Sequence, residues 1–208
     1  MIFILIQKYN VIKKFLINPV FDLSKIPSEI KYEKFREVHT FLLTNKPKTQ
    51  NYIFKRVYDS ESYPIFIMVS RTIEEKYEKR IEKHRNVTEK TYFEAISSQR
   101  DPRFDLTKKS IIVFSAEIDN AHNLYYIEKI TSKNSTFLIL KVIRDSEHSS
   151  DKIVPDFIPV IEDITENPNF FSMNFANLDW TNSHPESSER YSKFSKESLS
   201  DIADNKNS

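Results

Sequence analysis

Residues 10–17 read NVIKKFLI, a run of β-branched and apolar residues that predicts a β-strand. Alternate side chains of a strand point to opposite faces, so each face would carry a single lysine among apolar neighbours. A lone ammonium group on a buried face is costly unless an anion or a partner group meets it. The fold therefore has to supply a partner for Lys14. The two expected faces are Asn10, Ile12, Lys14 and Leu16, and Val11, Lys13, Phe15 and Ile17.

The chain of 208 residues is long enough for one core and a tail, or for two small domains. Its formal net charge of +1 implies no general attraction to nucleic acid. The charge is unevenly distributed, because residues 151–208 hold 5 Lys and Arg against 11 Asp and Glu, and residues 1–150 hold 26 against 19. A basic body with an acidic tail is typical of a protein that meets phosphate with one part only.

The sequence contains no cysteine and no glycine. Without cysteine there are no disulfides, no Cys-ligated zinc and no thiol catalysis. Without glycine there are no Gly-rich phosphate loops, dinucleotide fingerprints or nucleophile elbows. The histidines lie in separate segments without metal-ligand spacing, which favours surface or hydrogen-bonded roles over a zinc site. They are His39, His84, His122, His148 and His184.

Strand-like runs, rich in β-branched and aromatic residues and bounded by Asn, Ser, Asp or Pro, dominate the chain. Residues 73–85, IEEKYEKRIEKHR, fit either a charged helix or a long polar strand, and resemblance to a known family makes us favour the strand. Residues 87–104 predict a helix that starts after Thr88 as N-cap and ends before Pro102. The expected strands cover residues 2–6, 10–17, 38–44, 51–58, 64–70, 110–118, 124–131 and 136–143.

An antiparallel sheet of about eight strands is expected to curl or close, because an open edge invites pairing with other chains. The sequence thus predicts an α+β fold, an antiparallel eight-stranded barrel with a few helices, over residues 1–180. Residues 181–208 are Ser-rich and acidic, and we expect an extended tail that a partner orders, because it cannot bury enough surface to fold alone. The apolar start, MIFILI, is too short to span a bilayer, so we expect a soluble, cytoplasmic protein.

Many basic residues lie within the strand-like runs rather than in the loops between them. One interpretation is a solvated outer face, on which long side chains extend toward water. The other is that several of them converge inside a curled sheet and form a groove that binds anions or RNA. Periodicity alone leaves both open. The candidate residues are Lys14, Lys55, Arg56, Arg71, Lys83, Arg85, Lys108, Lys109 and Lys141.

Several short segments follow one another in an order that is known from one protein family. The clearest pieces are QRDPRF (99–104), KKSIIVF (108–114) and the stretch from Pro155 to Met173. Over about residues 8–177 the order resembles the CYTH-like, or triphosphate-tunnel, domain, in the version at the C-terminus of the TRPL-translocation-defect protein family. The resemblance implies an eight-stranded antiparallel tunnel lined with basic residues for phosphates and with glutamates for a divalent metal.

The chain departs from this family at its acidic positions. Where the opening strand of the family carries two glutamates and a lysine on its inner face, this sequence has Asn10, Ile12 and Lys14, and a later inner glutamate is replaced by Lys141. Hard cations such as magnesium need several carboxylate oxygens. These departures from the family lead us to expect a tunnel that attracts anions with no metal, no cofactor and no hydrolysis. Family-like charges stay at Glu128 and Glu162, and at Lys55, Arg71 and Arg85.

Three functions follow as hypotheses. The first is a non-enzymatic, RNA-binding factor that keeps idle ribosomes inactive by occupying tRNA or mRNA sites, since the glycine-free composition and acidic tail resemble microsporidian ribosome dormancy factors. The second is a metal-dependent triphosphatase whose metal would be held by Glu128, Glu162 and other acidic residues. The third is a protein that binds a nucleotide or polyphosphate without turnover.

Overall fold

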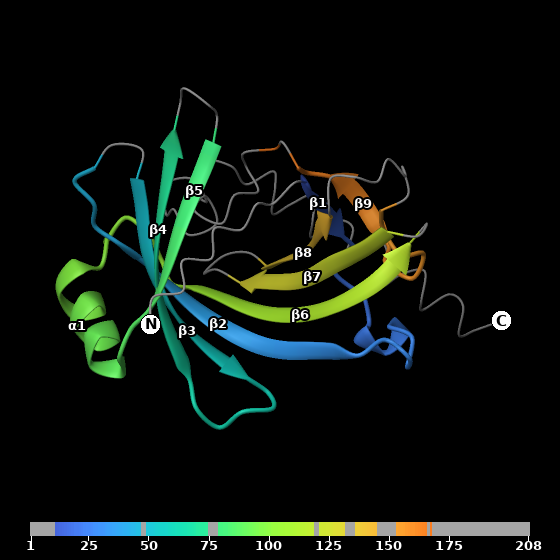
Figure 1. Ribbon diagram of the computed structural model, residues 1–208, viewed down its shortest axis with the longest axis horizontal. Helices are drawn as coiled ribbons and strands as arrows, with labels where there is room; N and C mark the ends of the chain where they lie inside the picture. Colours follow the sequence, from blue (N-terminus) through green and yellow to red (C-terminus); the bar gives the residue numbers. More distant parts are fainter. Residues whose placement is uncertain are drawn as a thin grey trace, which may run out of the picture.

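The computed structural model describes residues 11–46, 49–74, 79–118, 121–131, 136–144, 153–165 and 167. The expected strand at 2–6, Asn10, His148, His184 and the expected tail at 181–208 lie outside this part of the chain. The described residues form one antiparallel sheet with the strand order β5-β4-β3-β2-β6-β7-β8-β1-β9, together with one α-helix (Figure 1). The elements are β1 (Val11–Ile17), η1 (Leu23–Lys25), β2 (Tyr32–Leu42), β3 (Thr49–Tyr58), β4 (Ile65–Glu74), β5 (Lys79–Asn86), α1 (Glu89–Gln99), β6 (Thr107–Ile118), β7 (Ala121–Thr131), β8 (Thr136–Arg144) and β9 (Val160–Asp163).

The expected eight-stranded barrel is imprecise, because the sheet has nine strands and stays open within the described residues. The sheet is strongly curled (Figure 1), but β5 and β9 form its two edges and are not paired with each other. The edge strand β5 reads KRIEKHRN. Charged side chains on an edge strand oppose further strand pairing, so β5 is suited to end a sheet rather than to close it.

Most strands expected from the sequence are confirmed. The polar segment 73–85 contributes the end of β4 and most of β5, so the strand interpretation was right and the helix interpretation was wrong. Two features were missed. β2 begins at Tyr32, six residues before the expected start, and β9 was not expected. Both carry several exposed charged residues, which hide the apolar periodicity of a strand.

Two layers cover one face of the sheet, which we call the outer face. The helix α1 packs Tyr92 and Ala95 against Leu42, Ile53 and Phe66 of β2, β3 and β4. Thr88 caps this helix, as expected, since its side chain accepts a hydrogen bond from the backbone N–H of Thr91. Among the described residues, no helix is both long enough and apolar enough to span a membrane.

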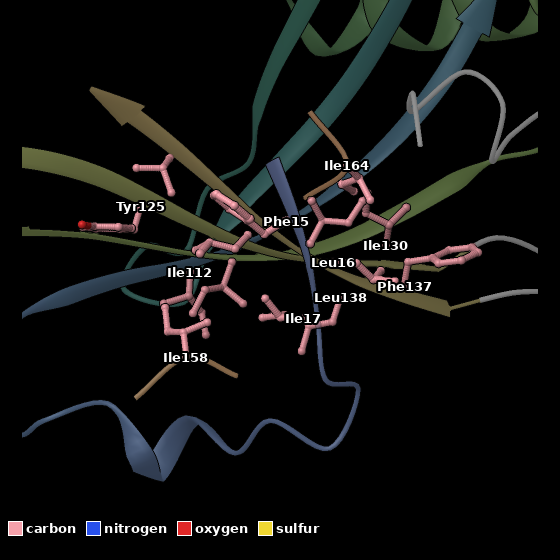
Figure 2. Close-up of a cluster of buried hydrophobic side chains, with 14 of the residues drawn as sticks. Phe15, Leu16, Ile17, Ile112, Tyr125, Ile130, Phe137, Leu138, Ile158 and Ile164 are labelled. Atoms are coloured by element: carbon pink, nitrogen blue, oxygen red, sulfur yellow. The ribbon is translucent and has the colours of Figure 1, made fainter. Parts of the chain in front are cut away.

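The second outer layer consists of segments 18–30 and 153–158, which pack on strands β6, β7, β8 and β1. Figure 2 shows Ile158 of this layer beside Ile112, while Ile164 lies near Leu16 and Ile130. The cross-strand register places Leu16 and Ile130 on the opposite face, which we call the inner face. Ile164 therefore adds an apolar contact to the inner face near Leu16 and Ile130.

Candidate anion-binding site on the inner face

The register of the sheet divides the nine candidate basic residues between its two faces. Residues directly opposite each other in an antiparallel pair point to the same side. Lys14 therefore points the same way as Lys141, and Lys109 the same way as Arg56, with Glu37 between them. Five candidates lie on the inner face, Lys14, Arg56, Arg71, Lys109 and Lys141, and four on the outer face, Lys55, Lys83, Arg85 and Lys108.

Inner-face side chains from strands that are not neighbours interact with one another. β4 and β6 are separated by β3 and β2, which would place their backbones about 14 Å apart in a flat sheet. The pKa of Lys109 on β6 is lowered mainly by burial, and the positive charge of Arg71 on β4 lowers it further. The curl of the sheet thus brings these two cations toward the same space.

Glu37 is the centre of the first buried ion pair. Its Oε1 accepts hydrogen bonds from Nε of Arg56 at 2.8 Å and contacts Nη2 of the same side chain at 2.6 Å. On its other side, Nε2 of His39 donates to Oε2 over 2.6 Å. Burial opposes ionisation of this carboxyl group, but the hydrogen bond from His39 and the charge of Arg56 lower the pKa of Glu37 to about 2. Glu37 is therefore a carboxylate at neutral pH.

His39 is buried between aromatic rings. Its imidazole stacks on Phe54, with centroids 4.8 Å apart, and on Tyr52 at 5.5 Å. Burial, together with the neighbouring charge of Lys109, lowers the pKa of His39, against the opposing effect of Glu37. This histidine is thus hydrogen-bonded inside the fold, as expected, although no sequence pattern indicated its partner.

Glu128 is the centre of the second buried ion pair and contacts two lysines. Nζ of Lys109 lies 3.5 Å from its Oε2, and Nζ of Lys141 lies 2.5 Å from its Oε1. Only 5% of the Glu128 side chain and 6% of the Lys109 side chain are exposed. Burial opposes ionisation here too, but the charges of both lysines outweigh it and lower the pKa of Glu128 to about 2.

A third pair lies toward the β5 edge, where Nε of Arg71 contacts Oε1 of Glu82 at 2.5 Å. The same guanidinium group donates to Oε1 of Gln50 at 3.2 Å and to the hydroxyl of Tyr52 at 3.4 Å. Burial opposes ionisation of Glu82, but hydrogen bonds from His84 and Arg71 lower its pKa to about 2. Arg71 is therefore fixed by three partners from β3 and β5.

The sequence raised the question of what Lys14 faces. Lys14 lies opposite Lys141 on the inner face, and it is partly buried. Its backbone is tied to the segment after β9, since its N–H donates to Oγ1 of Thr165 and its carbonyl accepts from the N–H of Ile164. The lysine thus adds a further cation beside the Glu128 ion pair. We call Lys14, Glu37, His39, Arg56, Lys109, Glu128 and Lys141 the inner cluster.

Three residues of the inner face, Glu37, His39 and Glu82, were not among the candidate binding residues chosen from the sequence. Glu37 and His39 occupy alternate positions in β2, a spacing that could have placed them on one face with Phe35 and Phe41. Glu82 lies in the segment whose strand or helix identity was open. Nothing in the sequence links these residues to their basic partners, because each partner comes from another strand.

A divalent metal, as the family resemblance implies, does not fit the described residues of this face. No three or more His, Cys, Asp or Glu side chains among these residues are grouped so that they could hold a metal ion. Glu37 and Glu128 each accept from two side chains, and Glu162 is exposed on β9, opposite Leu16. Magnesium needs several carboxylate oxygens that are free of cationic neighbours.

Comparisons with known proteins give partial likenesses of fold. No family model and no curated protein matches the chain. Among solved structures, the inorganic triphosphatase NE1496 is 15% identical, with 80% of this chain and 93% of that chain covered and a TM-score of 0.45. The PH1819 protein from Pyrococcus horikoshii OT3 is 12% identical, with 64% and 76% covered and a TM-score of 0.46. Since both TM-scores are below 0.5, the site is interpreted from its own residues.

Proposed function

We propose that the inner face binds the phosphate groups of a small polyanion, such as tripolyphosphate or a nucleotide. The observation that supports this best is the set of partly exposed cations Arg56, Arg71 and Lys141, which come from β3, β4 and β8 and face the same side of the sheet. Between 20% and 27% of each side chain is exposed, so a ligand can reach them. Charged donors that converge on one space are the usual recognition elements for phosphate.

Each of these cations is held in place by a buried or partly buried carboxylate. Arg56 is fixed by Glu37, and Lys141 by Glu128. A guanidinium group has five N–H donors, and Arg56 directs three of them to Glu37 and to the hydroxyl of Tyr58. The cations are therefore oriented before a ligand arrives, which reduces the conformational entropy that binding has to overcome.

The charge of the inner cluster supports an anionic ligand. It contains four basic side chains, Lys14, Arg56, Lys109 and Lys141, against two carboxylates, Glu37 and Glu128. The structural alternative is that these pairs only stabilise the fold. The partial exposure of Arg56 and Lys141, which leaves both charges accessible to an anion, favours a function in binding. Because the carboxylates are engaged by cations, we expect binding without hydrolysis.

Isothermal titration of the full chain with tripolyphosphate and with ATP, in the presence of EDTA, tests the proposal. Lys141→Gln removes one exposed cation while Lys109 still compensates Glu128, so the fold is expected to persist. Charge-assisted hydrogen bonds contribute about 1.5–3 kcal/mol, so affinity is expected to fall by roughly 10-fold or more. Lys90→Gln is the matched control, since this lysine is 84% exposed and lies on α1, the helix that covers the outer face.

Two results would overturn parts of the proposal. If the folded protein shows no heat of binding with tripolyphosphate or ATP at low salt, phosphate binding on this face would be excluded. Release of phosphate in the presence of magnesium or manganese, if abolished by Glu128→Gln, would replace binding alone by a triphosphatase activity.

A further inference from the structure

Within the described residues, the two outer layers leave a strip of the sheet between them uncovered. The α1 layer reaches Phe66 on β4, and the second layer reaches Ile112 on β6. Between these contacts, two cross-strand rows of residues run over β3, β2, β6 and β7. We call them the outer strip: one row is Lys55, Val38, Lys108 and Thr131, and the other is Val57, Arg36, Ser110 and Lys129.

The outer strip carries four cations and no carboxylate. Strand and residue spacings place Lys55 and Lys108 about 10 Å apart, with the second row about 7 Å away along the strands. Arg36 is 67% exposed, and Lys108 and Lys129 are also exposed. Among the ion pairs of the described residues, one involves the strip: Arg36 contacts the carboxylate of Asp59 at 3.7 Å.

A solvated sheet face also needs polar side chains, but solubility is served by charges of both signs. Arg36 contacts Asp59, but Lys55, Lys108 and Lys129 carry charges of one sign on β3, β6 and β7, an arrangement suited to an extended anion. This positive surface is separate from the inner cluster, because Lys108 and Lys109, and likewise Lys55 and Arg56, are consecutive residues that point to opposite faces.

An open hollow of about 570 Å³ continues the strip at the end of β3. Arg36, Val57 and Ser110 of the strip line it together with Lys34, Tyr58, Asp59 and Glu61, so its lining holds two cations and two carboxylates. The turn after β3 carries Tyr63, which is 83% exposed, and Tyr32 at the start of β2 is 49% exposed. Exposed aromatic rings are the elements on which unpaired bases stack.

We propose that the outer strip binds the phosphodiester backbone of single-stranded nucleic acid. The lysines and Arg36 would contact successive phosphates, and the hollow would receive a base. An anionic membrane fits less well, since the strip offers only the half-buried Val38 and Val57 as apolar groups and nothing long enough to insert between lipids. The proposal is independent of phosphate binding on the inner face.

Fluorescence anisotropy of a labelled oligouridylate with the full chain, over a series of salt concentrations, tests this proposal. Each phosphate contact contributes about −0.7 to the slope of log affinity against log salt for a single strand. Three lysine contacts therefore weaken binding roughly 20-fold over an about fourfold rise in salt. Combined substitution Lys55→Gln, Lys108→Gln and Lys129→Gln is expected to remove about 2 from the slope, with at least about 10-fold weaker binding at low salt.

The matched control is Lys25→Gln, Lys46→Gln and Lys90→Gln, which changes the net charge equally at exposed positions outside the strip. Equal affinity and slope for the strip variant and the control would overturn the proposal. Binding to phosphatidylserine vesicles in place of the oligouridylate would also overturn it. Lys141→Gln separates the two faces, because it is expected to weaken tripolyphosphate binding and to leave oligouridylate binding unchanged. Loss of oligouridylate binding in this variant alone would assign the nucleic acid to the inner face.

Discussion

Replacing Glu128 with glutamine removes the charge that Lys109 and Lys141 share. The side chain keeps its size and its capacity for hydrogen bonds, but Lys109, with 6% of its side chain exposed, loses the carboxylate that compensates its charge. The folded protein lowers the pKa of Glu128 from 4.5 to about 2. Since one pKa unit corresponds to about 1.4 kcal/mol, ionisation of Glu128 contributes about 3 kcal/mol to the free energy of unfolding at pH 7.

The Glu128→Gln variant is therefore expected to lose about 3 kcal/mol at pH 7, within the range for breaking a buried ion pair from one side. For a chain of this length, such a loss lowers the midpoint of thermal unfolding by about 6–12 °C. Urea denaturation followed by circular dichroism measures the free energy directly. The control is Glu94→Gln on α1, whose exposed pair with Lys90 spans 3.8 Å, and its change is expected to stay within about 0.5 kcal/mol.

The sign of the pH dependence separates charge from packing. A carboxyl group with a lowered pKa stabilises the fold above its unfolded value of about 4.5, and this contribution is lost as the pH falls toward about 2. The variant has no group to titrate at this position, so its deficit is expected to shrink to about 1 kcal/mol at pH 3. A deficit that is equal at pH 3 and pH 7 would refute the electrostatic account, as would a loss below about 1 kcal/mol at pH 7.

Three further predictions concern other parts of the molecule. Thr88→Ala removes the N-cap of α1 and is expected to lower the free energy of unfolding by about 1 kcal/mol in urea titrations, and an unchanged midpoint would contradict the cap. His39→Phe keeps an aromatic ring but removes the donor to Glu37, so acid unfolding is expected to begin at a higher pH than in the wild type; an unchanged acid midpoint would show that this hydrogen bond is dispensable. Ribosome binding stays a prediction from the sequence: the protein is expected to sediment with ribosomes at low salt and to be released as salt rises, and protein left in the supernatant at low salt would argue against it.

The strands were predictable because their residues carry the signal locally. β-branched and aromatic runs bounded by turn residues identified β7 and β8, and the N-cap and apolar stripe identified α1. The closure of the sheet was not predictable in this way. It depends on whether two strands far apart in the chain meet, and the charged strand β5 and the short strand β9 instead form separate edges.

From the residue order alone, consecutive basic residues such as Lys108 and Lys109 are expected on opposite faces of one strand. Which of the two lies inside follows from the pairing of the strands in the sheet. Lys109 lies opposite Glu37 and near Glu128, whereas Lys108 lies opposite Val38 on the uncovered outer strip. The register of a strand with its neighbours sets which of its faces lies inside. A shift of one residue would therefore exchange the positions of the two lysines.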